Sequence, residues 1–196
     1  MSRSTFTTHT AHVNDTELAY TDEGRGESVV LLHGHAYDRS MWDGQVTTLA
    51  EQGWRVIAPD LRGFGESQVT EGIVYTEEFA ADIVALLDEL GLETVILLGF
   101  SMSGQVAMQI AASYPERVSA LIINDTVPTS EDAAGRRRRP VAADGIVRDG
   151  METYAQNVLS KMIAEENVER LPEVAERVRE RLAELDDWFT PGRRRP

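Results

Sequence analysis

The sequence contains no cysteine, so disulfides and thiolate metal sites are excluded. It has almost no lysine, Lys161 being the single one, and its basic charge comes from arginine. Acidic residues outnumber basic ones by 33 to 19, which gives a formal net charge of −14. Nucleic acids and anionic membranes would repel such a chain, so we expect neither as a partner.

Long apolar runs are also missing. No stretch approaches the length of a membrane span, and the polar first residues lack the apolar core of a signal peptide. We therefore expect a cytoplasmic protein.

Histidine is scarce and confined to the N-terminal part of the chain. The four histidines are His9, His12, His33 and His35. His9 and His12 are three residues apart in a segment with strand character, which places them on opposite faces. This spacing argues against a joint metal site, and we expect no metal and no organic cofactor.

The remaining pattern predicts an α/β fold. Residues 4–21 predict a hairpin that turns at Asn14-Asp15. Short apolar runs then alternate with helical patterns, which is typical of a parallel sheet with helices on both faces. The predicted strands are 28–32, 54–58, 94–99 and 118–123, and the predicted helices are 41–51, 76–90 and 102–113.

The character of the sequence changes after Asp125. A polar loop over 128–144 carries Arg136 to Arg139, which we interpret as a solvated loop, with a specific anion site as the alternative. Amphipathic helices are predicted over 146–165 and 173–189, with Pro172 in the first turn of the second. We divide the chain into a core over 1–127, a helical region over 128–190 and a disordered tail over 191–196.

The most informative stretch runs from Thr94 to Gln105. An apolar strand ends at Gly99, and a helix begins just after Ser101, which has small residues two positions to either side. This is the pattern of a nucleophile elbow, in which a sharp turn exposes the serine. A phosphate-binding loop is excluded, because Gln105 replaces the required lysine. An ordinary strand-to-helix turn remains the alternative from this stretch alone.

Several motifs in order give the chain its family resemblance. His33-Gly34 follows one predicted strand, Asp60-x-Arg62-Gly63-x-Gly65-x-Ser67 follows the next, and Gly99-x-Ser101-x-Ser103-Gly104 follows the third. Together they resemble the α/β-hydrolase superfamily, most of all its small esterase, lactonase and cofactor-free haloperoxidase-like branch. The resemblance covers residues 10–126, and the helical part from residue 131 onward resembles that family's lid in position and character.

The resemblance implies a set of site residues. Ser101 would be the nucleophile that forms an acyl-enzyme with a small acyl substrate. The backbone N–H groups of Met102 and His35 would hold the oxyanion. Trp42 would line the acyl pocket, as would the His35 side chain. His33 would be a structural residue that braces loops, and Ser103 would only be the small residue that the turn needs.

The sequence departs from the family at its chemistry. In this fold an acid and then a histidine follow the serine in chain order, yet all four histidines here precede Ser101. Asp125 follows the sixth predicted strand, where some branches place the acid. We expect the sheet to end after this strand, and its apolar edge, Val118 to Ile123, to promote self-association.

Three explanations stay open for the absent histidine. The chain is a truncated relative of an active enzyme, or a divergent member that kept a binding pocket without catalysis, or a second chain completes the site. From the resemblance, the expected function is a serine hydrolase that acts on a small ester or a related acyl substrate. The alternative is a non-catalytic hydrolase-fold protein that retains a small-molecule pocket.

Overall fold

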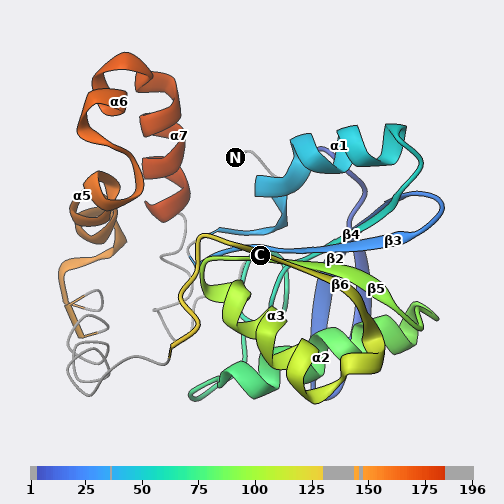
Figure 1. Cartoon of the computed structure of the whole chain (residues 1–196). Coiled ribbons are helices and arrows are strands. Elements are labelled where there is room, and N and C mark those ends of the chain that lie inside the picture. Colours follow the sequence, from blue (N-terminus) through green and yellow to red (C-terminus); the bar gives the residue numbers. More distant parts are fainter. Residues whose placement is uncertain (1–3, 36, 130–143, 146–147, 184–196) are drawn as a thin grey trace. The chain divides into compact units, whose positions relative to one another are not determined.

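The computed structural model describes residues 4–35, 37–129, 144–145 and 148–183 (Figure 1). The chain divides into two compact units, Met1–Pro128 and Thr129–Pro196, which are described separately. No helix in the described part of the chain combines the length and the apolar character needed to cross a bilayer.

The first unit contains one six-stranded sheet in the order β1-β2-β4-β3-β5-β6. The two N-terminal strands form an antiparallel hairpin, β2 is antiparallel to β4, and the other pairs are parallel. The strands are β1 (His9–Val13), β2 (Thr16–Gly24), β3 (Ser28–Leu32), β4 (Arg55–Pro59), β5 (Val95–Phe100) and β6 (Val118–Asn124). The predicted hairpin is confirmed, with Asn14 in its turn at φ 50°. This mostly parallel arrangement confirms the predicted fold class.

Helices cover both faces of this sheet, with α1 on one face and α2 and α3 on the other (Figure 1). The helical elements are η1 (Arg39–Trp42), α1 (Asp43–Glu51), α2 (Thr76–Glu89), α3 (Met102–Ser113) and η2 (Pro115–Arg117). The central strand β3 is buried along its whole length. Such continuous apolar strands are typical of sheets covered on both faces, and they fix the core.

The last strand differs from the others in its burial. We predicted a buried strand over 118–123, but no residue of β6 is fully buried. Leu121, Ile122 and Ile123 are 39%, 45% and 39% exposed. The reason is its place at the end of the strand order, since β5 alone pairs with it among the strands of the described residues. An apolar run thus predicted the strand correctly, but it did not predict the burial.

The second unit, in its described residues, consists of α5 (Met151–Met162), α6 (Glu165–Arg170) and α7 (Pro172–Ala183). α5 and α6 both pack against α7, with Ala155 and Ala175 buried. The helix predicted over 146–165 is confirmed over the shorter range of α5, because extended backbone at Ile163 ends it. The short helix α6 was not predicted. Pro172 begins α7 as predicted. The role of this unit as a lid stays a prediction.

The remaining expectations for this region lie outside the described residues. They are the loop arginines Arg136 to Arg139, the last turns of the helix predicted over 173–189, and the tail over 191–196.

Candidate active site

Ser101 lies in the sharp turn between β5 and α3. Its φ is 53° and its ψ is −116°, a strained backbone conformation for a residue with a side chain. Two hydrogen bonds fix this turn: the Ser101 N–H donates to the Asn124 carbonyl at 2.9 Å, and the Gly104 N–H donates to the Ser101 carbonyl at 3.0 Å. The elbow geometry predicted from the sequence is therefore present.

The elbow also explains the small residues around it. A Cβ on Gly99 would lie 2.3 Å from the Ser103 carbonyl oxygen, and one on Gly104 would lie 2.4 Å from Thr126 Cγ2. Neither position has room for a side chain. The close approach of β5 to the first turn of α3 therefore depends on Gly99, and the close approach of α3 to Thr126 depends on Gly104.

The loop that follows β3 touches the elbow directly. A Cβ on Gly34 would lie 2.7 Å from the Phe100 ring and 3.3 Å from Ser101 Cβ. The Ser103 hydroxyl, buried in α3, donates a hydrogen bond to the His33 carbonyl. Ser103 therefore does more than supply the small residue we expected: it fastens the His33-Gly34 loop to the elbow helix. In the sequence, the one hint of this role is a second serine two positions after Ser101.

The two expected oxyanion donors belong to the two segments that meet in this contact, the first turn of α3 and the loop after β3. Met102 is the first residue of α3, so its N–H has no partner within the helix. The helix dipole also favours negative charge at this position. His35 follows Gly34, and its side chain is exposed, with the ring edge-on to Phe64 at 6.2 Å. Their joint action as an oxyanion hole stays a prediction.

His33 has the character of a brace for loops. The imidazole is completely buried, with Nδ1 2.9 Å from the Gly34 carbonyl and Nε2 accepting from the Leu61 N–H at 3.0 Å. This pattern places the proton on Nδ1 of a neutral ring. Burial lowers the pKa of His33 to about 4. The ring is thus committed to joining the loops after β3 and β4, and it offers no basic nitrogen to Ser101.

Two other histidines lie in a strand far from the elbow. His9 and His12 lie in β1, at the opposite edge of the sheet from β6, and His9 stacks on Tyr20. The described residues contain no cluster of three or more acidic or histidine side chains suited to a metal ion.

Asp125 directly follows β6, one residue beyond the Asn124 carbonyl that bonds to Ser101. It is exposed and has a φ of 47°. The acid that the resemblance points to therefore lies at the same end of the sheet as the elbow. Whether it acts there is a prediction.

Trp42 is a buried residue of the core. Its side chain is 6% exposed and packs in the core with Val29 and Leu31, and its ring meets Phe100 edge-on at 6.4 Å. Within the described residues its ring N–H has no hydrogen-bond partner. Trp42 thus supports Phe100, the residue before the nucleophile, while direct substrate contact stays a prediction.

A buried ionic cluster that the sequence did not reveal holds the surrounding loops. The Asp60 carboxylate accepts from the Arg39 and Glu66 N–H groups at 2.6 and 2.8 Å and pairs with the Arg39 guanidinium. The Arg39 guanidinium also pairs with Glu66 and donates to Thr8 at 2.6 Å. Burial raises the pKa of Asp60 to about 6, against the opposing effect of Arg39. This cluster joins the segments that follow β3 and β4, the same two segments that His33 connects.

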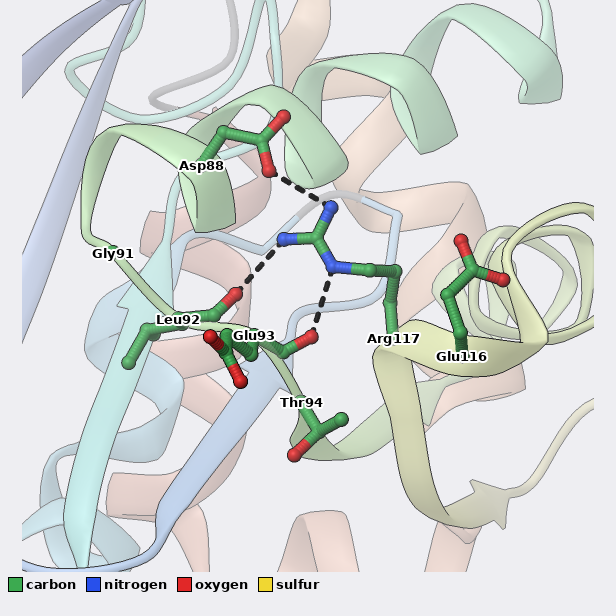
Figure 2. Close-up of a pocket in the computed structure, with 7 residues that line it drawn as sticks. All are labelled: Asp88, Gly91, Leu92, Glu93, Thr94, Glu116 and Arg117. Atoms are coloured by element: carbon green, nitrogen blue, oxygen red, sulfur yellow. Dashed lines mark hydrogen bonds and ion pairs between the residues drawn. The ribbon is translucent and has the colours of Figure 1, made fainter.

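A hollow in the first unit is lined by residues other than those of this site (Figure 2). It measures about 550 Å³ and is formed where α2 ends and β5 and β6 begin. At its centre the Arg117 guanidinium pairs with Asp88 at 2.8 Å and donates to the Leu92 and Glu93 carbonyls at 2.8 and 2.9 Å. Parallel strands begin at one end of the sheet and finish at the other. The hollow lies where β5 and β6 begin, whereas Ser101 follows the end of β5, so the hollow does not serve Ser101. Arg117 there links α2, the start of β5 and the start of β6.

Comparison with known proteins identifies the family. Residues 27–181 match the family model described as alpha/beta hydrolase fold. The chain belongs to the α/β-hydrolase fold family.

Solved structures of this family resemble the chain closely. An esterase from Thermogutta terrifontis is 34% identical, with a TM-score of 0.86 over 93% of this chain and 69% of its own. The enol-lactonase from Burkholderia xenovorans LB400 is 27% identical, with a TM-score of 0.82 over 92% of this chain and 70% of its own.

Among curated relatives, the soluble epoxide hydrolase of Corynebacterium sp. strain C12 is 35% identical over 136 residues, which is 69% of this chain and 47% of the relative. The chain spans about half the length, or less, of the first curated relatives it matches. Its α/β-hydrolase relatives thus include esterases, lactonases, epoxide hydrolases and haloperoxidases. This range fits the site described, but it does not select one substrate.

Proposed function

We propose that the chain hydrolyses small carboxylic esters through an acyl-enzyme on Ser101. The observation that carries this proposal is the positive φ of Ser101 at the start of α3, with Gly34 of the facing loop packed against it. In a nucleophile elbow the serine hydroxyl points out of the turn, next to backbone N–H groups that can stabilise the negative charge formed in the reaction. The likeness to an esterase and a lactonase agrees with this chemistry.

The reaction proceeds in two steps. The Ser101 hydroxyl oxygen attacks the ester carbonyl carbon while its proton passes to a water molecule or to a base added in solution. The Met102 and His35 N–H groups stabilise the oxyanion, and the alcohol leaves after taking up a proton. Water then attacks the acyl-enzyme, which releases the carboxylic acid and returns the proton to Ser101.

Neither nitrogen of His33 is available as the base, since Nδ1 lies against the Gly34 carbonyl and Nε2 accepts from the Leu61 N–H. Oxyanion stabilisation and binding alone still leave a rate enhancement of roughly 10³–10⁴ over water in serine hydrolases that lack triad members. We therefore expect slow turnover from this chain by itself.

The second candidate is a hydrolase-fold protein that binds a small molecule without converting it. The observation that favours it is the commitment of His33 to the Gly34 carbonyl and the Leu61 N–H. In that case Ser101 would be retained as part of a pocket rather than as a nucleophile.

An assay with added base separates the two candidates. Hydrolysis of p-nitrophenyl acetate and butyrate is measured for the wild type and for Ser101→Ala, with and without free imidazole. Imidazole can take the place of a missing histidine side chain as proton acceptor. Subtraction of the Ser101→Ala rate at each imidazole concentration removes the direct reaction of imidazole with the ester.

The ester-hydrolase proposal predicts a Ser101-dependent rate that rises with imidazole and a covalent fluorophosphonate adduct on Ser101, located by peptide mass spectrometry. Ser113→Ala, at the exposed end of α3, is the matched control and retains the wild-type rate. Equal rates for the wild type and Ser101→Ala at every imidazole concentration, with no adduct, would leave only the binding candidate.

A further inference from the structure

The segment before β1, residues 4–8, is tied to the start of α1. The Asp43 carboxylate accepts hydrogen bonds from the Ser4 hydroxyl at 2.8 Å and from the Thr5 N–H at 2.9 Å. Asp43 is the first residue of α1, where the helix dipole also favours a carboxylate. Phe6 then packs against a buried apolar cluster formed by η1, α1 and the sheet. These contacts hold the segment along the face of the sheet that α1 covers.

The other end of this segment joins the ionic cluster around Asp60. The Thr8 hydroxyl donates to the Glu66 carboxylate at 2.9 Å and accepts from the Arg39 guanidinium at 2.6 Å. The sheet register brings Thr8 to this place, because the first residue of β1 and the last residue of β4 both pair with Tyr20 of β2. Thr8 therefore lies level with the end of β4, where the loop that carries Glu66 begins.

The loop after β3 is anchored at two points, and His35 lies between them. At the first anchor, the His33 carbonyl accepts from the Ser103 hydroxyl of α3. At the second, the Arg39 N–H donates to the Asp60 carboxylate at 2.6 Å and the Arg39 guanidinium pairs with the same carboxylate. His35 is two residues after the first anchor and four residues before the second. The place of its N–H therefore depends on both anchors.

We propose that residues 4–8 act as a strap that positions the loop after β3, with Thr8 and Arg39 as positioning residues for the His35 N–H. The Thr8 hydroxyl lies between a cation and a carboxylate, and hydrogen bonds to charged groups are stronger than those between neutral groups. Arg39 is only 4% exposed, so water cannot readily replace a partner that its guanidinium loses. The proposal rests on the ester hydrolysis proposed above, because the His35 N–H acts only once an oxyanion forms beside Ser101.

Three variants isolate the contribution of the Thr8 hydroxyl. Thr8→Val removes the hydroxyl and keeps the shape of the side chain, whereas Thr8→Ser keeps the hydroxyl. Thr10→Val makes the same change as the first variant at an exposed position two residues further along, in β1. Thr8 is itself exposed, so we expect all three variants to fold.

Amide hydrogen exchange, followed by NMR, measures how firmly the loop is held and needs no turnover. The Tyr37 N–H donates to the Gly34 carbonyl at 3.2 Å, so its exchange reports on the turn that contains His35. We expect this exchange to accelerate about two- to tenfold in Thr8→Val, the effect of one lost hydrogen bond. Thr8→Ser and Thr10→Val should keep the wild-type rate.

A distant amide serves as the reference for these rates. The Leu92 N–H donates to the Leu87 carbonyl at 2.9 Å, at the end of α2 that lies near the start of β5 and away from Ser101. Its exchange should be equal in the wild type and in all three variants, so that a change confined to Tyr37 is a local effect.

Turnover of p-nitrophenyl butyrate with imidazole tests whether the position of the loop matters for the reaction. The Ser101-dependent kcat should fall about threefold or more in Thr8→Val at an almost unchanged KM, because a displaced oxyanion donor weakens the transition state more than the bound substrate. Thr8→Ser should restore kcat, and Thr10→Val should retain it. Arg39→Lys should lower kcat as well, and Thr8→Val should add little to that loss, since both residues belong to the same anchor.

The proposal is overturned if Thr8→Val matches Thr10→Val in Tyr37 exchange and in kcat, or if Thr8→Ser loses as much as Thr8→Val. Faster exchange with an unchanged kcat would also overturn it, because the strap would then only stabilise the fold. A wild type without Ser101-dependent turnover would contradict the proposed function instead. The Tyr37 exchange in Thr8→Val would then decide by itself whether residues 4–8 position the loop.

Discussion

Gly99 has no space for even one additional carbon atom. A Cβ there would lie 2.3 Å from the Ser103 carbonyl oxygen, which is backbone and cannot rotate away. We predict that Gly99→Ala destabilises the fold by about 2 kcal/mol or more and lowers Ser101 acylation further, because the turn must open. Urea unfolding and the p-nitrophenyl ester assay measure the two effects.

Gly44→Ala is the matched control for this substitution. Gly44 lies exposed in α1, and a Cβ there would meet nothing within 4 Å. Alanine should stabilise the helix by about 0.5–1 kcal/mol. Equal stability changes at the two positions would contradict the steric account of the elbow.

Because burial lowers the pKa of His33, we predict that the stability of the fold depends on pH. The pKa of this residue is about 4 when folded and about 6.5 when unfolded, so the unfolded chain binds the proton more tightly. Its effect is therefore absent above pH 6.5, and it destabilises the fold increasingly as the pH falls toward 4. Between pH 7.5 and pH 5 the loss amounts to about 2 kcal/mol.

The measurement compares the wild type with His33→Asn, since asparagine retains an acceptor for the Leu61 N–H. Burial also raises the pKa of Asp60, which acts with the opposite sign over the same range but is present in both proteins. The difference in unfolding free energy between the two should narrow as the pH falls. Parallel pH profiles would show that His33 is not the titrating group.

The loop after β4 is joined to α2 by a buried ion pair. Arg62 binds the Asp82 carboxylate through two hydrogen bonds of 2.7 and 2.8 Å, and both side chains are almost fully buried. Arg62→Leu leaves Asp82 without its charge partner. We predict a loss of about 3–5 kcal/mol in the free energy of unfolding, measured with urea.

The double variant Arg62→Leu with Asp82→Leu tests the origin of that loss. Replacement of both charges removes the uncompensated carboxylate, so the double variant should be more stable than Arg62→Leu alone. A double variant that loses the sum of the two single effects would show that the residues contribute independently.

The elements themselves were largely predictable from the sequence. Strand and helix positions in 9–124 follow from apolar runs with clear turn residues between them, and Gly99-x-Ser101 marked the elbow. Local pattern did not reveal what depends on distant partners. The break between α5 and α6, the exposure of β6, the Ser103 bond to His33 and the cluster around Asp60 each depend on where other segments lie.

The whole chain carries far more negative than positive charge, with a net of −14. Such an excess disfavours the compact state by self-repulsion, and salt reduces that repulsion. We predict that the melting temperature rises when NaCl increases from about 20 mM to about 300 mM, a range over which the screening length falls severalfold. Calorimetry at fixed protein concentration measures this.

Calorimetry repeated at a tenfold lower protein concentration separates folding from association, since an oligomer would make the melting temperature depend on concentration. A salt-induced rise that is the same at both concentrations reflects intramolecular repulsion. A melting temperature that falls with salt would mean that attractive pairs such as Arg55–Asp22 outweigh the repulsion.

The strained backbone of Ser101 has an evolutionary consequence. Glycine adopts a positive φ without steric cost, so Ser101→Gly should make the protein more stable by up to about 1 kcal/mol. Neutral drift at this position would therefore favour loss of the hydroxyl. Ser101 therefore lowers the stability of the fold, as expected where a side chain serves the proposed chemistry rather than packing.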